Sequence, residues 1–118
     1  MFITDEIQYF VSNNEPTSKS FYTRLYKLFF KHYILQENFY RCVYCGSLAT
    51  TLDHIISKSK GGQSLHSNLI GCCVSCNKSK GTNKWDIWYK QQTFYKKTSY
   101  EYICNRINKN NTNFLYNQ

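Results

Sequence analysis

The stretch that decides the fold runs from residue 42 to residue 81 and reads CVYCGSLATTLDHIISKSKGGQSLHSNLIGCCVSCNKSKG. It contains two C-x-x-C turns, Cys42 with Cys45 and Cys73 with Cys76. Each such turn directs two thiolates at one ion, and two turns complete the tetrahedral shell of Zn(II) without an open position. The spacing therefore predicts a structural zinc site that joins the two ends of the stretch.

Other uses of the cysteines stay open at this point. Cys72 stands next to Cys73 but outside the C-x-x-C register, and a shift of the zinc ligand to Cys72 would change the alignment of the residues that follow. Cys104 stands alone in an expected helix, where a cysteine is more often a small buried hydrophobe. Two disulfides are the competing interpretation of the paired turns. Disulfides require export, and the N-terminal MFITDEIQYF has acidic residues where a secretory signal has basic ones, so we expect a cytoplasmic protein.

The size and charge of the chain point to one domain with a polyanionic partner. The chain has 118 residues, which is typical of a single domain, and its formal net charge is +8. A balance this basic favours nucleic acid as the partner, although a solvated basic surface has the same composition. No apolar run approaches the roughly 18 residues of a membrane span, because Lys31 and His32 interrupt FFKHYIL. We expect no membrane association.

Apolar residues recur at helical spacing before the cysteine stretch. The pattern predicts an amphipathic helix over residues 21–36, with Ser18 or Ser20 as its N-cap. The aromatic residues of this helix are expected to face a core, because helical stripes usually do so.

The remaining segments predict a mixture of short strands and helices. Residues 48–56 and residues 69–70 are typical of strands, and the polar Gly-Gly segment between them is typical of a loop. One or two helices are expected within 84–107, followed by a polar tail that frays. The chain is thus divided into an N-terminal segment (1–20), an amphipathic helix (21–40), a core (41–83) and a C-terminal helical extension with a tail (84–118).

Chemically active residue types stand at fixed intervals within the cysteine stretch. Asp53 and His54 are adjacent, and Asn68, Asn77 and Lys80 follow. Residues 52–81, LDHIISKSKGGQSLHSNLIGCCVSCNKSKG, resemble the HNH endonuclease motif in its zinc-stapled form, with DHI, the GG loop, NL, CxxCN and the final KG in order. WYKQQTFY, residues 88–95, also resembles a segment of bacterial and phage HNH proteins. Ser57 and Thr93 depart from this pattern, since proline is common at both positions.

The resemblance implies an α+β fold with a ββα-metal (His-Me finger) core, flanked by helices. It also implies a role for each residue: His54 is the general base, Asp53 and Asn77 hold a catalytic Mg(II) or Mn(II), and Asn68 braces the loop. Lys80 either steadies the transition state or anchors the nucleic-acid backbone. The residue chemistry agrees, because carboxylate and amide oxygens suit Mg(II) and a neutral imidazole accepts a proton from water. Any one of these residues alone would be an ordinary turn, cap or polar residue.

The basic residues near the motif are expected to contact double-stranded DNA, and the protein is expected to be a monomer or a weak dimer. The first candidates are Arg41, Lys58, Lys60, Lys78 and Lys84. The resemblance implies a homing-like nuclease of a phage or mobile element, acting in a bacterial or phage-infected cell. Two alternatives are kept: a restriction or repair HNH nuclease, and a catalytically silent zinc-containing module that binds nucleic acid. The intact set of Asp53, His54 and Asn77 favours an enzyme.

Overall fold

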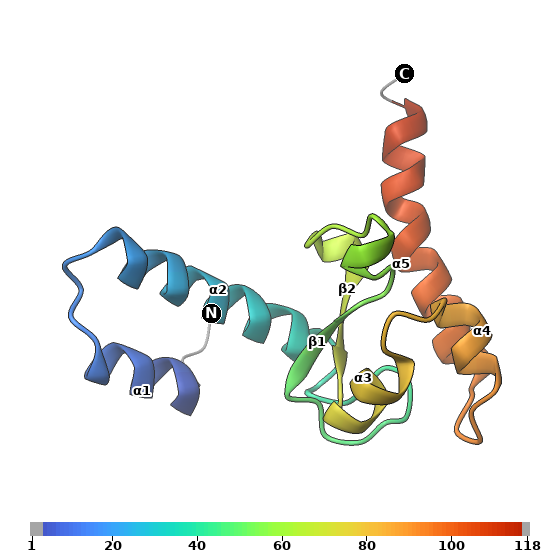
Figure 1. Cartoon of the computed structure of the whole chain (residues 1–118), viewed down its shortest axis with the longest axis horizontal. Helices are drawn as coiled ribbons and strands as arrows, with labels where there is room; N and C mark the ends of the chain where they lie inside the picture. The colour runs from blue at the N-terminus through green and yellow to red at the C-terminus, as the bar shows by residue number, and fades with distance from the viewer. Residues whose placement is uncertain (1–3, 117–118) are drawn as a thin grey trace.

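A pair of antiparallel strands forms the centre of the protein in a computed structural model that describes residues 4–116 (Figure 1). Strand β1 (Thr51–His54) pairs with β2 (Leu69–Cys72), so that Asp53 lies opposite Ile70 and His54 opposite Leu69. Helix α3 (Val74–Lys80) follows β2 and contacts β1. The predicted ββα arrangement is therefore present. The first strand is shorter than the predicted 48–56, because Leu48 forms only an isolated bridge with Arg41.

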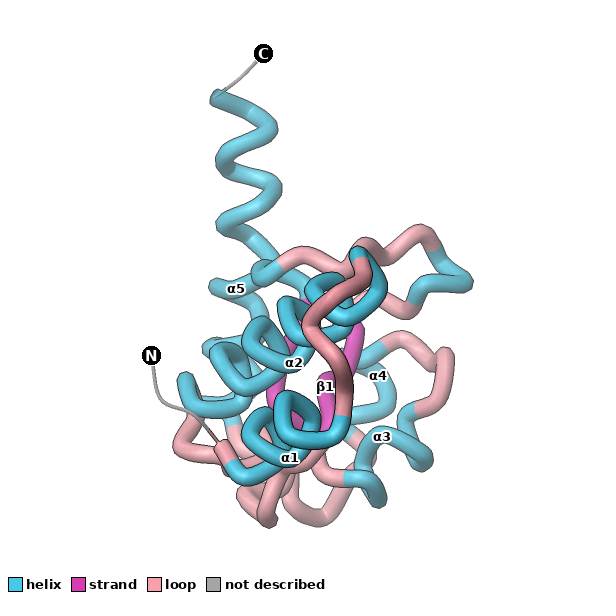
Figure 2. The backbone as a smooth tube through the Cα atoms, turned by 90° about the vertical axis from the view of Figure 1, so that its left-hand side faces the viewer, coloured by secondary structure: helices cyan, strands magenta, loops and turns pink. Residues whose placement is uncertain are grey.

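Two helices precede this unit and form a hairpin beside it. Helix α1 (Asp5–Asn13) was not predicted, and its first turn is capped by Thr4, whose hydroxyl accepts a hydrogen bond from the Ile7 amide. Helix α2 (Lys19–Glu37) begins two residues before the predicted helix, with Ser18 as its N-cap. It crosses in front of the strands when the molecule is seen from the side of the hairpin (Figure 2).

The aromatic residues of α2 do not all face the core, which corrects our prediction. Phe21 is buried, where its ring stacks on Phe10 of α1, but Tyr22, Tyr26 and Tyr33 are exposed. Tyrosine tolerates an exposed position because its hydroxyl can form hydrogen bonds, as that of Tyr22 does when it donates to the Pro16 carbonyl oxygen at 3.2 Å. Only four residues of α2 are therefore buried: Phe21, His32, Ile34 and Leu35.

Two helices close the other side of the core, in agreement with the expected one or two. Helix α4 (Trp85–Lys90) places Trp88 and Tyr89 in the core, and helix α5 (Lys97–Tyr116) adds Ile103. Helix α5 then rises away from the strands (Figure 1) and continues to Tyr116, through the segment predicted to fray. Its extension is consistent with the low cost of adding residues to a helix that has already formed. Within residues 4–116, no helix is both long and apolar enough to cross a membrane.

Candidate functional site

Four cysteine sulfurs lie close together, where the turn that precedes β1 meets the start of α3. The sulfurs of Cys42, Cys45, Cys73 and Cys76 all lie within 4.8 Å of one another, and those of Cys45 and Cys73 are 3.6 Å apart. Tetrahedral Zn(II), with bonds of about 2.3 Å, places its sulfur ligands roughly 3.8 Å apart. The cluster therefore has the donor type and the spacing to hold such an ion. Cys72 is not one of the four, although its buried thiol contacts that of Cys42 as well as the Cys73 carbonyl oxygen, so the cluster has the predicted C-x-x-C register.

Asp53 is held in the interior by two hydrogen bonds. Its side chain is only 4% exposed, and the Tyr44 hydroxyl donates to Oδ2 at 2.7 Å. The Lys80 ammonium, which is fully buried, donates to Oδ1 at 3.2 Å and to the His54 carbonyl oxygen at 2.9 Å. Burial raises the pKa of Asp53, whereas the charge of Lys80 and the hydrogen bond from Tyr44 oppose this rise. The structure thus brings Asp53 and Lys80 together as an ion pair, and it places Lys80 away from solvent.

His54 is the last residue of β1 and is partly accessible. Its Nε2 lies 2.9 Å from the Ser64 hydroxyl. Burial lowers the pKa of His54, and the positive charge of Lys58 lowers it further, while the negative charge of Asp53 raises it by less. These effects together favour the neutral imidazole, which is the state that a general base requires.

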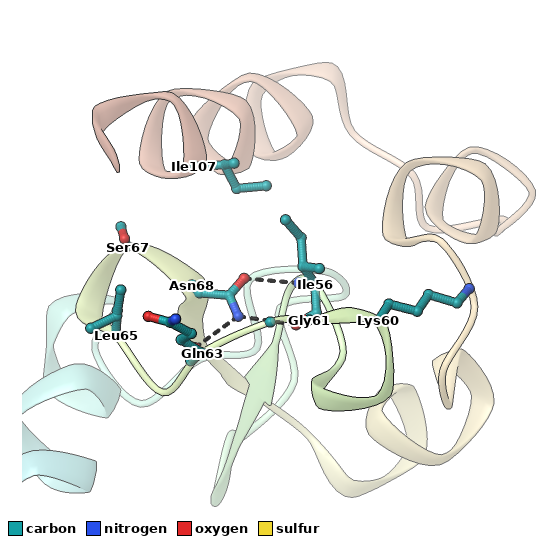
Figure 3. A pocket seen from close by; sticks show the side chains of 9 residues that line it. Ile56, Lys60, Gly61, Gln63, Leu65, Ser67, Asn68 and Ile107 are labelled. Carbon is teal, nitrogen blue, oxygen red and sulfur yellow. Dashed lines mark hydrogen bonds between the residues drawn. The ribbon is translucent and has the colours of Figure 1, made fainter. Parts of the chain in front are cut away.

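Asn68 braces the loop that joins the two strands. Its amide nitrogen donates to the carbonyl oxygens of Ile56 and Gln63 at 3.0 and 2.9 Å, and its oxygen accepts from the Ile56 amide at 2.9 Å (Figure 3). Gly62 lies inside this brace, where an added Cβ would meet the Ile56 carbonyl oxygen at 1.7 Å. Because Gln63 precedes Ser64, the brace also fixes the segment that contacts His54. Bracing of the loop by Asn68 was the expectation, and its role in the chemistry stays a prediction.

The loop also encloses a small pocket under α5. Its volume is about 330 Å³, and Leu65, Ile107 and the Gln63 side chain are among the groups that line it (Figure 3). Asn68 forms part of the wall. The pocket therefore lies between part of the loop and α5, which also contacts the loop directly at residues His66–Asn68.

Asn77 is anchored to β1 by its side-chain nitrogen. This nitrogen donates to the Thr51 hydroxyl at 3.2 Å and to the Leu52 carbonyl oxygen at 3.1 Å, which leaves the amide oxygen as the group that can bind an ion. An amide oxygen and a carboxylate oxygen, such as those of Asn77 and Asp53, are donor types that suit a hard divalent cation. The donor atoms fit such an ion, and the Lys80 ammonium competes with it for Oδ1 of Asp53.

Comparison with known proteins agrees with the geometry. Residues 42–83 match the model of the HNH endonuclease family. We refer to this segment, for its match to that family, as the HNH domain. The chain is also 38% identical over 55 residues to the CRISPR-associated endonuclease Cas9 of Corynebacterium diphtheriae, a match that covers 42% of this chain and 5% of that protein. No solved structure matches the chain significantly.

The basic residues expected to contact nucleic acid lie on the surface of the HNH domain and directly before and after it. Lys60 and Lys84 line one pocket, together with Trp85. All five candidates are exposed, in contrast to the buried Lys80: Arg41, Lys58, Lys60, Lys78 and Lys84. Their ammonium and guanidinium groups are therefore free to contact phosphates.

Three residues of the HNH domain contact the site and were not predicted from the sequence. Tyr44 binds Asp53, Ser64 binds His54, and Thr51 binds Asn77. The sequence held one indication that Tyr44 is near the site: it lies between Cys42 and Cys45, in the turn that precedes β1 and therefore Asp53. The other two are common polar residues whose roles depend on the folded loop and the strand register.

Proposed function

We propose that this chain is a metal-dependent DNA endonuclease that hydrolyses phosphodiester bonds. The observation that carries the proposal is the placement of three residues: His54 at the partly accessible end of β1, the buried Asp53 carboxylate next to it, and Asn77 of α3 hydrogen-bonded to the same strand. The match of residues 42–83 to the HNH endonuclease family supports it.

His54 would accept a proton from a water molecule as that water attacks the scissile phosphorus. The new bond joins the water oxygen to phosphorus, and the bond from phosphorus to the 3′ oxygen breaks. The 3′ oxygen then takes a proton from solvent, which leaves a 5′-phosphate and a 3′-hydroxyl. A divalent ion bound by Asp53 and Asn77, Mg(II) or Mn(II), would supply stabilisation of the charge that develops on the phosphate and the leaving oxygen.

We assign Lys80 a holding role in this scheme. Its ammonium neutralises Asp53 and fixes the carbonyl group of His54, so it orients both residues of the Asp-His pair. To reach a phosphate it would have to leave a buried ion pair, which costs several kcal/mol when one partner stays unpaired (about 3 to 5). The charge that contacts DNA is instead provided by the exposed basic residues, and binding should weaken steeply with salt.

The four-cysteine cluster is proposed to hold structural Zn(II), since a closed tetrahedral shell has no position for substrate. The biological setting that we favour is a homing-like nuclease of a phage or mobile element, which rests on the motif alone. Restriction or repair is the alternative setting.

One observation favours a second candidate function, a silent zinc module that binds nucleic acid. Each carboxylate oxygen of Asp53 already accepts a hydrogen bond from a protein group, so an ion would have to share Oδ1 with the Lys80 ammonium or replace it there. If the ion did neither, the domain would bind DNA without cleaving it.

Cleavage of supercoiled plasmid at low salt with Mg(II) separates the two candidates. The wild type should nick or linearise the plasmid, and His54→Ala should be slower by about 10²- to 10⁴-fold, the usual contribution of a general base. His66→Ala is the matched control, because His66 is exposed and binds Glu37 instead of the site. Equal cleavage by the wild type and His54→Ala would overturn the assigned base. DNA binding without cleavage by the wild type would favour the silent module.

A further inference from the structure

The Tyr44 hydroxyl connects the zinc cluster to the carboxylate of the nuclease site. We propose that Tyr44 is a positioning residue, which selects the oxygen of Asp53 that binds the catalytic ion. The inference rests on the proposed function, in which Asp53 is a ligand of that ion. If it holds, the turn between Cys42 and Cys45 would have two roles: it would bind zinc, and it would orient Asp53 through Tyr44.

The contact between Tyr44 and Asp53 is short and buried. The hydroxyl oxygen lies 2.7 Å from Oδ2, and the residues are 1% and 3% exposed. A hydrogen bond to a carboxylate is stronger than one between neutral groups, and a low dielectric strengthens it further. The contact therefore restrains rotation of the carboxylate.

The Tyr44 ring has little freedom of its own. It packs edge-on against Trp88 and Tyr89, with ring centroids 5.0 and 5.2 Å away. Its backbone carbonyl accepts a hydrogen bond from the Tyr89 hydroxyl at 2.9 Å, and the flanking residues of its turn include Cys42 and Cys45. The position of the hydroxyl is thus set by the cysteine turn and by α4.

The two oxygens of Asp53 consequently have different tasks. Oδ2 accepts from a neutral hydroxyl on a ring packed in the core, whereas Oδ1 accepts from the buried Lys80 ammonium at the longer distance of 3.2 Å. A cation would repel the ammonium but not the hydroxyl. Oδ1 would therefore be the oxygen available to an ion, while Tyr44 keeps the carboxylate oriented.

Removal of this hydroxyl should weaken ion binding without loss of the fold. Loss of a partner that orients a metal ligand typically lowers metal affinity or activity by about 10- to 100-fold. Tyr44→Phe should therefore bind Mn(II) more weakly by that factor. Its cleavage should need a correspondingly higher Mg(II) concentration and should recover at saturating Mg(II), with KM for DNA unchanged.

The test measures Mn(II) binding by electron paramagnetic resonance on zinc-loaded, full-length protein. Asp53→Asn is the reference for loss of the ligand. Tyr95→Phe is the matched control, because it also removes a hydroxyl from the aromatic cluster around Tyr89 but does not contact Asp53. Zinc content and melting temperature are measured for every variant.

Each outcome decides a separate claim. Weaker Mn(II) binding by Asp53→Asn and Tyr44→Phe, with normal binding by Tyr95→Phe, supports the inference. Normal binding by Tyr44→Phe beside weak binding by Asp53→Asn overturns it and leaves the proposed function intact. Normal binding by Asp53→Asn removes the metal assignment itself. Loss of zinc from Tyr44→Phe would assign the hydroxyl to folding and would also overturn the positioning role.

Discussion

At the scale of single residues, His54 depends on neighbours that keep its imidazole neutral. Burial and the positive charge of Lys58 both lower its pKa below the usual value of 6.5. Because the neutral form is the base, the cleavage rate should fall as the pH falls through this lowered pKa. The acid limb of the rate profile is therefore expected below pH 6.5.

Lys58→Gln should move this limb to higher pH. The substitution removes a charge that disfavours the imidazolium, so the pKa of His54 rises and the base is lost at a less acidic pH. The measurement is the single-turnover rate between roughly pH 5 and pH 8, with enzyme in excess so that weaker DNA binding has no effect. Lys78→Gln, which removes another exposed charge, should leave the limb unchanged. A shift to lower pH in Lys58→Gln would contradict the electrostatic explanation.

The sequence predicted residues with local signals better than residues with distant partners. Cys42, Cys45, Cys73 and Cys76 were identified because a C-x-x-C turn is a local structure, and they converge as expected. Lys80 looked like a phosphate contact, but its burial depends on the packing of α3 against β1. Spacing along the chain contains no information about that packing.

At the scale of elements, the loop between β1 and β2 holds the residues on either side of His54 in place. Asn68 joins Ile56, which follows His54 by two positions, to Gln63, which precedes Ser64. The pair Gly61-Gly62 was predicted as loop. In the structure, glycine is needed at each of the two positions for a different reason. Gly61 has a φ of 91°, and Gly62 has no room for a Cβ.

Gly62→Ala should therefore damage the loop more than Gly61→Ala. An added Cβ at Gly62 would lie 1.7 Å from the Ile56 carbonyl oxygen, so the brace must open, whereas at Gly61 it meets nothing within 4 Å. Gly61→Ala costs only the left-handed conformation of its backbone, about 1 to 2 kcal/mol. We expect a lower melting temperature and at least tenfold slower cleavage for Gly62→Ala than for Gly61→Ala, a factor typical of lost supporting contacts. Equal effects of the two substitutions would show that the brace is not needed.

The other elements show which structural features a local sequence pattern can predict and which it cannot. Ser18 was one of two predicted caps, beside Ser20, because the capping signal lies within one helical turn, and the structure has Ser18 in that position. Helix α1 was missed, and contacts over long sequence distances hold it: Glu6 accepts from Lys31 at 3.0 Å and lies 2.6 Å from Nε2 of His32. The exposed tyrosines of α2 show the same limitation, since hydrophobic spacing alone did not determine which side of the helix is covered.

At the scale of the whole molecule, the cysteine cluster joins the two ends of the HNH domain. A bound structural zinc ion contributes roughly 10 to 16 kcal/mol in small zinc domains, which is comparable to the total stability of a typical domain. The cluster includes Cys73, whose sulfur accepts a hydrogen bond from the Cys76 amide at the start of α3. Loss of zinc should therefore release α3 and with it Asn77.

Cys76→Ser should lose zinc and its cooperative melting transition, as measured by metal analysis and circular dichroism. Cys104→Ser is the matched control, because Cys104 lies in α5 outside the cluster, and its variant should keep both zinc and the transition. A chelator strong enough to remove zinc should unfold the wild type. A folded Cys76→Ser protein without metal and with a normal melting temperature would contradict the structural role of the ion.

The central claim is that the imidazole of His54 is the base of a phosphodiester hydrolysis, and chemical rescue tests it most directly. His54→Gly leaves space where the ring was, and its single-turnover plasmid cleavage with saturating Mg(II) is measured with and without added imidazole. The account predicts a rate about 10²- to 10⁴-fold below the wild type, with partial recovery that increases with the concentration of neutral imidazole. Cleavage by His54→Gly at the wild-type rate without imidazole would contradict it.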